Sequence, residues 1–416
     1  MTAPVVTAAP EPALVRAAAP AGRPARWCFF SPGTRSRKVL AGDSRTTGGA
    51  EAQVAHLAAA LAARGHAVTL IDGDGWGQAR PETLAGVLCL DAAPDWRRPG
   101  SLAGFWRALR EAGPDVVYAR LPSDFLVLVA LAARLRPRTR FVYALAHDLH
   151  TRAWTAYDHR RWFHAPLFAL ARLGAHRIAV QHPGQRSALA PSLRARAVPV
   201  PNIVGRIGAE PRDGGRARYD VVWVAKIRPE KRLDLLLDLA RACPALTFAV
   251  VGGYDPLLPP GLRDALAGRA AMLANVACLG EMRAPDVLDT LAASRVLVNT
   301  SDAEGFPNTM LEAWSLGVPV VSLSVDPGGV IAAEGLGLVS RDAEGLARDV
   351  GRMVRDAGLN RACGARGQDY VRCRHGADVV VAALEALAPD SPGKDGRRTG
   401  SDPEVDNRQS GRRWPV

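Results

Sequence analysis

Short β-branched and apolar runs alternate with Ala- and Leu-rich helical segments along most of this chain. The run "RWCFFS" is followed by the helical segment "GGAEAQVAHLAAALAARG" and then by the run "HAVTLID". Apolar runs separated by amphipathic helices of this length are typical of βαβ units, which build a parallel sheet covered by helices on both faces. The sequence therefore predicts an α/β fold.

The alternation stops once, in the Pro- and Gly-rich stretch "ARAVPVPNIVGRIGAEPRDGGRARYD", and then restarts with "DVVWVAKI". A chain of 416 residues is longer than one hydrophobic core normally supports. We therefore predict two doubly wound, Rossmann-like domains, at residues 26–202 and 203–375. They would face a central cleft at the carboxyl ends of both sheets, where such folds bind ligands. The polar ends at residues 1–25 and 389–416 are predicted to be disordered.

Positive charge is concentrated in one part of the chain. The net charge is +12, and residues 120–206 contain fourteen arginines against three aspartates, a net of +11. A basic region of this kind favours an anionic neighbour, which could be a phospholipid surface, a phosphorylated substrate or nucleic acid. The alternative is the arginine-rich usage of a high-GC genome, since the chain contains only four lysines.

The cysteines and the hydropathy pattern are typical of a cytoplasmic protein. The six cysteines lie far apart, without a CxxC pair or a zinc-site spacing, which predicts reduced thiols and no metal site. No run approaches the roughly 18 apolar residues of a membrane span. The Ala/Pro-rich N-terminus lacks the charged leader and apolar core of a secretory signal. We expect a cytoplasmic location, with peripheral attachment to the inner face of the membrane as an alternative.

Two glutamates stand eight positions apart in "SDAEGFPNTMLEAWSLGVPVV", residues 301–321. Glu304 is expected on the loop after a strand, Pro307 in the first turn of a helix, and Glu312 more than one turn inside that helix. Unpaired N–H groups at the helix start form a natural anion site. Each carboxylate could accept hydrogen bonds from a diol. The order of carboxylate, anion site and second carboxylate therefore matches the sugar hydroxyls, diphosphate and ribose hydroxyls of a nucleotide sugar. Two solvated helix-end glutamates are the alternative on spacing alone.

Two of the four lysines, Lys226 and Lys231, lie in the segment "VVWVAKIRPEKRLDLLLDLA". Lys226 is expected at the end of a strand, and Lys231 in the turn before the next helix. A pair of cations beside a cleft can neutralise a leaving diphosphate without a metal ion. Two ordinary surface lysines are the alternative.

Four segments in this order, "WVAKIRPEKR", "FAVVGG", "VACLGEM" and "VLVNTSDAEGFPNTMLEAWSLGVPVVS", resemble the donor half of the retaining GT-B glycosyltransferases of family 4. The resemblance implies two Rossmann-like domains, with a helix at residues 376–388 that crosses back to the first domain. It also implies a hexosyltransferase-type enzyme with a nucleotide-sugar donor and no metal cofactor. The acceptor would be a glycan or lipid-linked glycan in cell-surface polysaccharide or glycolipid biosynthesis, with no nucleic acid partner.

The resemblance implies roles for individual residues of these segments. Glu304 would contact the transferred sugar, and Glu312 would bind the ribose. Lys226 and Lys231 would hold the diphosphate, although the family more often has Arg at the first position, and Lys lacks the bidentate fork of Arg. Further donor contacts would come from the helix start and from two neighbouring loops: Gly305, Phe306, Pro307, Asn308, Gly252, Gly253 and Met282.

The first half of the chain resembles the family more loosely. Gly48 and Gly49 would start a helix beneath the diphosphate, because glycines permit close backbone approach. A turn punctuated by glycines is the alternative. His147, at the end of "FVYALAH", is the first candidate to touch the donor sugar near its reacting centre, and Asp148 is the second. A buried, hydrogen-bonded histidine is the alternative, and Gln185 would line the acceptor side or cap a helix.

The implied catalytic residues are His147, Glu304, Lys226 and Lys231. No paired acid and base carboxylates at hydrolase spacing are visible. In front-face mechanisms proposed for this family, the leaving phosphate takes the acceptor proton. A non-catalytic sugar-nucleotide-binding protein on the same fold is one alternative. A dinucleotide-dependent oxidoreductase is disfavoured, because no GxGxxG motif follows the first strand.

One segment, "TRAWTAYDHRRWFHAPLFALARLGAHR", mixes Trp154, Trp162 and Phe163 with arginines. Such a mixture can lie on an anionic membrane, which would suit a lipid-linked acceptor. A helix on the domain surface with an apolar inner face is the alternative.

Overall fold

The protein is described from a computed structural model. The structure describes residues 24–43, 48–73, 80–95, 97–152, 164–205 and 217–389. The arm predicted at 1–25 and the tail predicted at 389–416 lie almost entirely outside these ranges, as do Trp154, Trp162 and Phe163. The predictions for those segments therefore stay predictions.

The first sheet has eight strands in the order β3-β4-β2-β1-β5-β6-β7-β8. All neighbours are parallel except β3, which pairs antiparallel with β4 at one edge. Buried β-branched and aromatic side chains fill the central strands, as expected for a sheet covered on both faces. The strands are β1 (Arg26–Phe30), β2 (Ala67–Asp72), β3 (Glu82–Leu84), β4 (Val87–Asp91), β5 (Val116–Ala119), β6 (Arg140–Ala144), β7 (Arg177–Val180) and β8 (Ala197–Pro199).

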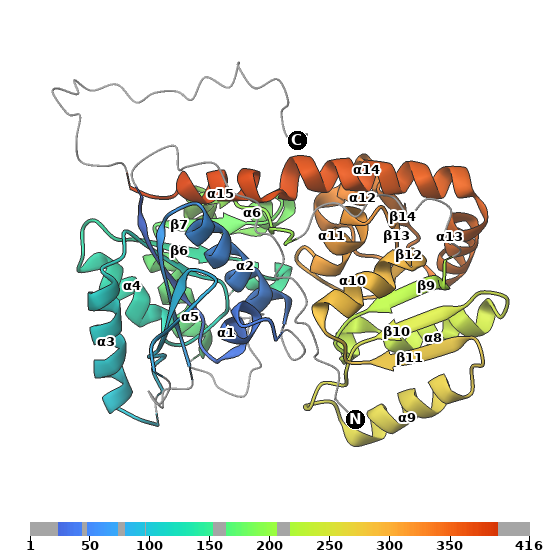
Figure 1. Ribbon diagram of the computed structural model, residues 1–416, viewed down its shortest axis with the longest axis horizontal. Coiled ribbons are helices and arrows are strands. Elements are labelled where there is room, and N and C mark those ends of the chain that lie inside the picture. The colour runs from blue at the N-terminus through green and yellow to red at the C-terminus, as the bar shows by residue number, and fades with distance from the viewer. Residues whose placement is uncertain are drawn as a thin grey trace, which may run out of the picture.

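Helices cover the first sheet on both faces (Figure 1). One core cluster joins the sheet to α3, α4 and α5, and a second joins it to α2 on the opposite face. Short helices follow several strands at the edge that faces the second domain. The helices are α1 (Arg35–Leu40), α2 (Gly49–Ala63), α3 (Gly100–Ala112), α4 (Leu126–Arg134), η1 (Asp148–Thr151), α5 (His164–Gly174), α6 (Pro183–Ala188) and α7 (Pro191–Arg194).

The second sheet has six parallel strands in the order β11-β10-β9-β12-β13-β14. The chain starts in the centre with β9, builds outward to β11, and then returns to the other side of β9 with β12. This reversal is the topological switch point of a Rossmann-like sheet, beside which ligands bind. The strands are β9 (Tyr219–Val224), β10 (Phe248–Val251), β11 (Val276–Gly280), β12 (Ser294–Asn299), β13 (Val320–Ser322) and β14 (Gly337–Val339).

The second sheet is also covered on both faces. One core cluster includes α8, α9 and α13, and the other includes α10, α11 and α12. The predicted α/β fold with two Rossmann-like domains is therefore confirmed. The helical segments are η3 (Pro229–Lys231), α8 (Leu233–Ala242), α9 (Pro260–Ala271), α10 (Ala284–Ala292), α11 (Asn308–Ser315), η4 (Pro327–Gly329), α12 (Val330–Ala333) and α13 (Ala343–Arg355).

Two C-terminal helices, α14 (Ala357–His375) and α15 (Ala377–Glu385), connect the domains along the top of Figure 1. Helix α14 packs on α11 of the second domain, and α15 packs on α2 of the first. Val380, Val381 and Leu384 of α15 are buried in the core of the first domain. The helix expected to cross back is thus present as α15. No helix within the described ranges is long and apolar enough to span a membrane.

Candidate functional site

The loops that follow β9 and β12 lie beside each other at the switch point of the second sheet. The two strands pair directly, with Val221 opposite Val296 and Val222 opposite Leu297. Lys226 follows β9, and Glu304 follows β12. Because parallel strands end at the same edge of a sheet, these side chains reach one region, as the sequence analysis predicts.

Lys231 and Glu304 form a direct ion pair in that region. The Lys231 ammonium donates to Oε1 of Glu304, which also accepts a hydrogen bond of 2.8 Å from the Ser301 hydroxyl. Lys226 lies 3.8 Å from a carboxylate oxygen of Asp255. Both predicted cations are therefore present at the site, and each is balanced by a carboxylate of the same domain.

Gly305 brings this loop into contact with the first domain. A methyl group added to Gly305 would meet the carbonyl oxygen of Ala146 at 2.7 Å, the Cα of His147 at 3.1 Å, and the side-chain oxygen of Gln181. Two of these atoms belong to the backbone and cannot turn away. Only glycine therefore permits this approach of the two domains.

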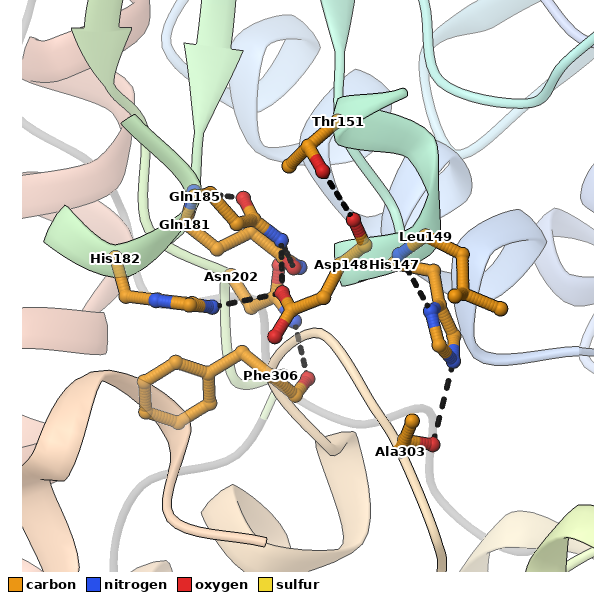
Figure 2. Close-up of polar contacts among 10 residues, drawn as sticks. All are labelled: His147, Asp148, Leu149, Thr151, Gln181, His182, Gln185, Asn202, Ala303 and Phe306. Atoms are coloured by element: carbon orange, nitrogen blue, oxygen red, sulfur yellow. Dashed lines mark hydrogen bonds and ion pairs between the residues drawn. The ribbon is translucent and has the colours of Figure 1, made fainter. Parts of the chain in front are cut away.

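His147 also connects the domains, as Figure 2 shows. Its Nδ1 accepts a hydrogen bond of 3.1 Å from the backbone N–H of Leu149, and its Nε2 lies 3.2 Å from the carbonyl oxygen of Ala303. Because Nδ1 accepts, the proton is assigned to Nε2, which donates to Ala303. His147 is therefore a partly buried, hydrogen-bonded histidine beside the loop that carries Glu304.

Asp148 is fixed by two side chains of the first domain (Figure 2). One carboxylate oxygen accepts hydrogen bonds from Nε2 of His182 at 2.9 Å and from Nε2 of Gln185 at 3.0 Å. The amide oxygen of Gln185 in turn accepts from the backbone N–H of Gln181 at 2.9 Å. Gln185 is thus a buried residue that positions Asp148, whose side chain stays 48% exposed.

Asn202, in the segment between the two sheets, binds residues of both domains. Its Oδ1 accepts hydrogen bonds from Arg120 at 2.6 Å and from Gln181 at 2.8 Å, which follow β5 and β7. Its Nδ2 donates to the carbonyl of Phe306 and to Oδ1 of Asn308, both at 3.0 Å. The side chain is fully enclosed. Asn202 therefore holds the start of α11 against the strand ends of the first sheet.

The backbone of Asn202 is tied to the crossover helices as well. Its carbonyl oxygen accepts a hydrogen bond of 2.7 Å from Nδ1 of His375, the last residue of α14. Burial lowers the pKa of His375 to about 4, so the ring is neutral at physiological pH, with its proton on Nδ1. The backbone of Asn202 therefore joins the segment between the two sheets to the end of α14.

The start of α11 also meets the glycine loop of the first domain. Nδ2 of Asn308 donates to the carbonyl of Gly49 at 2.9 Å, so the N-termini of α2 and α11 lie close together. Gly48 is the N-cap residue of α2, and a methyl group there would collide with the carboxylate of Glu51. The Glu51 carboxylate, paired with Arg35 at 3.3 Å, therefore lies over the start of α2.

Helix α11 begins one residue later than the sequence predicts. Pro307 is the N-cap, with an extended backbone (φ −61°, ψ 125°), and Asn308 is the first helical residue. The predicted stop at Gly317 is confirmed by its left-handed conformation, φ +72°. Phe306 and Pro307 are buried, and the carbonyl of Phe306 accepts the hydrogen bond from Asn202.

Glu312 lies inside α11, one turn beyond the helix start. Its carboxylate has no hydrogen-bond or ion-pair partner within the described ranges. Burial raises its pKa to about 7. A carboxylate of this kind is poised to accept hydrogen bonds from a ligand that supplies donors.

Replacing Glu312 with Gln is expected to stabilise the protein above neutral pH. The folded-state pKa of Glu312 is raised from 4.5 to about 7, so the wild-type loses stability as the pH rises through this window, whereas Gln does not titrate. The free energy of unfolding should favour the variant by about 3 kcal/mol at pH 8 and by almost nothing at pH 4. Denaturant unfolding at both pH values measures this, and an equal difference at both would contradict it.

The remaining predicted donor contacts lie at the ends of β10 and β11. Gly252 has φ +140°, and a methyl group there would collide with the carbonyl oxygen of Ala225 after β9. Its requirement for glycine therefore has a structural cause within the sheet. Gly253 has ordinary contact with Glu281 at 3.4 Å, and Met282 packs partly buried against the core of the second domain. Within the described ranges, no group of three His, Cys, Asp or Glu side chains could hold a metal ion.

Solved structures share this two-domain arrangement. Sucrose-phosphate synthase from Thermosynechococcus elongatus has a TM-score of 0.67 at 18% identity, over 87% of this chain and 97% of that chain. HepE from Anabaena, solved in complex with UDP-glucose, has a TM-score of 0.64 at 20% identity, over 87% and 98% of the two chains. WaaG, a glycosyltransferase involved in lipopolysaccharide biosynthesis, has a TM-score of 0.58 at 16% identity, over 87% and 98%.

Family models match both halves of the chain. A model described as Glycosyltransferase Family 4 matches residues 47–204, and one described as Glycosyl transferases group 1 matches residues 218–356. Each model matches one of the two domains, and the fold is the GT-B fold of the solved structures. A curated relative, an exopolysaccharide phosphotransferase from Streptomyces coelicolor, is 33% identical over 99 residues. That match covers 23% of this chain and only 10% of the relative.

The residues that join the two domains carry weak sequence signals. Asn202 lies in the Pro-rich stretch that marks the domain boundary, where nothing local distinguishes it. Arg120, Gln181 and His182 each follow a buried strand of the first sheet, at the edge where ligands of such folds bind. Position after a strand was therefore the one signal that could have identified them.

Proposed function

We propose that this protein is a glycosyltransferase that transfers a sugar from a nucleotide-sugar donor to a glycan or lipid-linked glycan, with retention of the anomeric configuration. The observation that carries the proposal is the ion pair of Lys231 with Glu304 at the switch point of the second sheet. Glu312, without a partner within the described ranges, lies eight positions further along on α11. Carboxylate, helix start and second carboxylate follow the order of sugar, diphosphate and ribose in a sugar nucleotide.

Each group of this arrangement has a proposed task. Lys226, Lys231 and the N–H groups at the start of α11 would bind the diphosphate and stabilise the charge that develops on it. Glu304 would accept hydrogen bonds from hydroxyls of the transferred sugar, and Glu312 from the two ribose hydroxyls. When the donor binds, Lys231 and Glu304 would separate. Lys231 would then bind the diphosphate, and Glu304 the sugar hydroxyls.

The reaction itself exchanges one bond of the anomeric carbon for another. The bond from that carbon to the leaving diphosphate oxygen breaks, and the bond to the acceptor oxygen forms on the same face. The acceptor proton passes to the leaving diphosphate, so no protein base is required. The N–H at Nε2 of His147 would donate to a sugar hydroxyl near the reacting centre, with Gly305 allowing the two domains to close on it.

The other predicted donor contacts belong to the same proposal. Gly48 and Gly49 would lie beneath the diphosphate once the Glu51 carboxylate turns away from the start of α2. Gly252, Gly253 and the backbone of Met282 would lie beside the nucleotide. The backbones of Phe306 and Pro307 and the side chain of Asn308 would complete the pocket.

Known proteins of similar fold support the substrate classes. The HepE structure holds UDP-glucose, and TarM of S. aureus, with a TM-score of 0.53, was solved with UDP and α-GlcNAc-glycerol. WaaG acts in lipopolysaccharide biosynthesis, and the Streptomyces relative is named for exopolysaccharide. We therefore propose a role in cell-surface polysaccharide or glycolipid biosynthesis, without a metal cofactor or a nucleic acid partner.

The proposed location is the cytoplasmic side of the membrane. The arginine-rich region at residues 120–206 carries a net charge of +11, which would attract an anionic membrane surface that contains a lipid-linked acceptor.

Replacing Lys231 with Ala is expected to weaken binding of a nucleoside diphosphate by about 30-fold, because one charge-assisted contact to phosphate is lost. Glu312→Ala should weaken it by about 10-fold through the ribose contact. Calorimetric titration with UDP, GDP and ADP measures both variants. Arg352→Ala, an exposed change on α13, is the control and should bind like the wild-type. Unchanged binding in both site variants would overturn the proposed donor site.

A further inference from the structure

Asp255 is a second carboxylate beside the lysines of the candidate donor site. It follows β10, which pairs with β9 on the side away from β12. Its Oδ2 lies 3.8 Å from the ammonium of Lys226. Glu304, which pairs with Lys231, follows β12 on the other side of β9. Each lysine of the site therefore faces a carboxylate from a different neighbouring strand.

Asp255 is held in place by donors other than Lys226. Its Oδ1 accepts a hydrogen bond of 2.9 Å from the backbone N–H of Leu257, and its Oδ2 accepts one of 2.6 Å from Nε of Arg228. The backbone N–H of Asp255 donates to the carbonyl of Ile227 at 3.0 Å, which ties the loop after β10 to the loop after β9. The side chain is only 11% exposed, so these bonds keep the carboxylate beside Lys226.

The Asp255 carboxylate keeps its negative charge at physiological pH. The hydrogen bond from the Leu257 N–H and the guanidinium of Arg228 lower its pKa below the usual value of an aspartate. A diphosphate that binds Lys226 must therefore share the ammonium with a fixed anion. Glu304 differs from Asp255, because its proposed ligands are hydroxyls, which a carboxylate binds directly.

We propose that Asp255 is a positioning residue that limits how tightly Lys226 holds the diphosphate, so that the nucleoside diphosphate left after transfer is released. An ammonium that faces both a fixed carboxylate and a diphosphate contributes less to binding than one that faces the diphosphate alone. Since the product must leave before the next donor binds, a weaker hold favours turnover. This inference rests on the proposed function, in which Lys226 binds the diphosphate of a sugar nucleotide.

Asp255→Asn tests the proposal in calorimetric titrations with UDP, GDP and ADP. Asparagine keeps the shape of the side chain and an oxygen that accepts from Leu257, but it removes the charge. The diphosphate that the wild-type binds is expected to bind the variant about fivefold more tightly, the effect of losing one partly exposed ion pair. Stopped-flow displacement should show a correspondingly slower dissociation.

A gain in affinity separates this role from a structural one, because damage to the fold would weaken binding. Asp255→Ser is a second variant, whose hydroxyl can still accept from the Leu257 N–H, and it should show the same gain. Asp369→Asn on α14 is the control. It removes a carboxylate that pairs with Arg372 at 2.8 Å and should bind like the wild-type.

A double-mutant cycle with Lys226→Gln shows whether Asp255 acts through Lys226. In the Lys226→Gln protein, the Asp255→Asn change should alter affinity by less than about twofold, because the shared ammonium is gone. An equal gain in both backgrounds would place the effect on Arg228 or on direct repulsion, and would overturn the role assigned to Asp255.

The same titrations distinguish this inference from the function on which it rests. Normal binding by the wild-type without a gain in either Asp255 variant would overturn the inference and leave the donor site intact. A wild-type protein that binds no nucleoside diphosphate and no sugar nucleotide would overturn both together.

Discussion

Replacing Gly305 with Ala is expected to lower turnover at least 100-fold while leaving nucleotide binding almost unchanged, because the added methyl group holds the domains apart rather than altering the second domain. That methyl group would meet the Ala146 carbonyl oxygen at 2.7 Å and the His147 Cα at 3.1 Å. Gly305 does not have a positive φ, so Ala fits its backbone conformation. The whole effect therefore falls on the contact between the domains.

Turnover is measured as release of the nucleoside diphosphate from the sugar nucleotide that binds, and binding by calorimetry. Small-angle scattering should also show a larger radius of gyration for the variant. Gly268→Ala is the matched control: it lies within α9, with no heavy atom within 4 Å of the added methyl group. Ala favours the helix there by about 0.5–1 kcal/mol, and turnover should stay at the wild-type rate. Wild-type turnover in Gly305→Ala would show that this contact is not needed.

Replacing Asn202 with Ala is expected to lower the free energy of unfolding by about 3–4 kcal/mol. The side chain makes four hydrogen bonds, two to each domain, of which three are buried and the one to Asn308 is partly buried. Arg120 would suffer most, because it is buried and has no ion pair within the described part of the chain. Its guanidinium would keep its charge and lose the acceptor at 2.6 Å.

Asn202→Asp distinguishes the two halves of this network. The carboxylate still accepts from Arg120 and Gln181, but it turns an acceptor toward the carbonyl of Phe306, where Nδ2 of Asn202 now donates. We expect this variant to lose less stability than Asn202→Ala, yet to separate the domains and lose turnover to a similar extent. Urea unfolding and scattering measure the two effects. A variant that unfolds like Asn202→Ala and keeps its compact shape would contradict the assigned role.

The sequence pattern was sufficient to predict where those site residues lie whose positions depend on one domain alone. Alternating strands and helices placed Lys226, Lys231 and Glu304 after strands of one sheet, and the helix signals placed Glu312 inside α11. These positions follow from the different side-chain periodicities of helices and strands and from the geometry of a parallel sheet. They require no knowledge of how the domains meet.

The contacts between the domains could not be predicted in this way. Asn202 reaches residues 82 positions before it and 106 positions after it, and no local pattern connects them. Within the second domain, the ion pair of Lys231 with Glu304 likewise joins residues 73 positions apart, which no local pattern connects. Gly252 has a further contact between separate elements, because a methyl group there would collide with the carbonyl oxygen of Ala225 after β9. Such contacts depend on how the elements dock, which a single sequence does not encode locally.

Thermal unfolding of the wild-type protein with a panel of sugar nucleotides tests the central claim most directly. The account predicts that at least one sugar nucleotide raises the midpoint by several degrees, and that NAD does not, because a ligand that binds only the folded state stabilises it. The same sugar nucleotide should stabilise Lys231→Ala much less, which locates the effect at the Lys231 and Glu304 pair. A wild-type protein stabilised by NAD and by no sugar nucleotide would contradict the account.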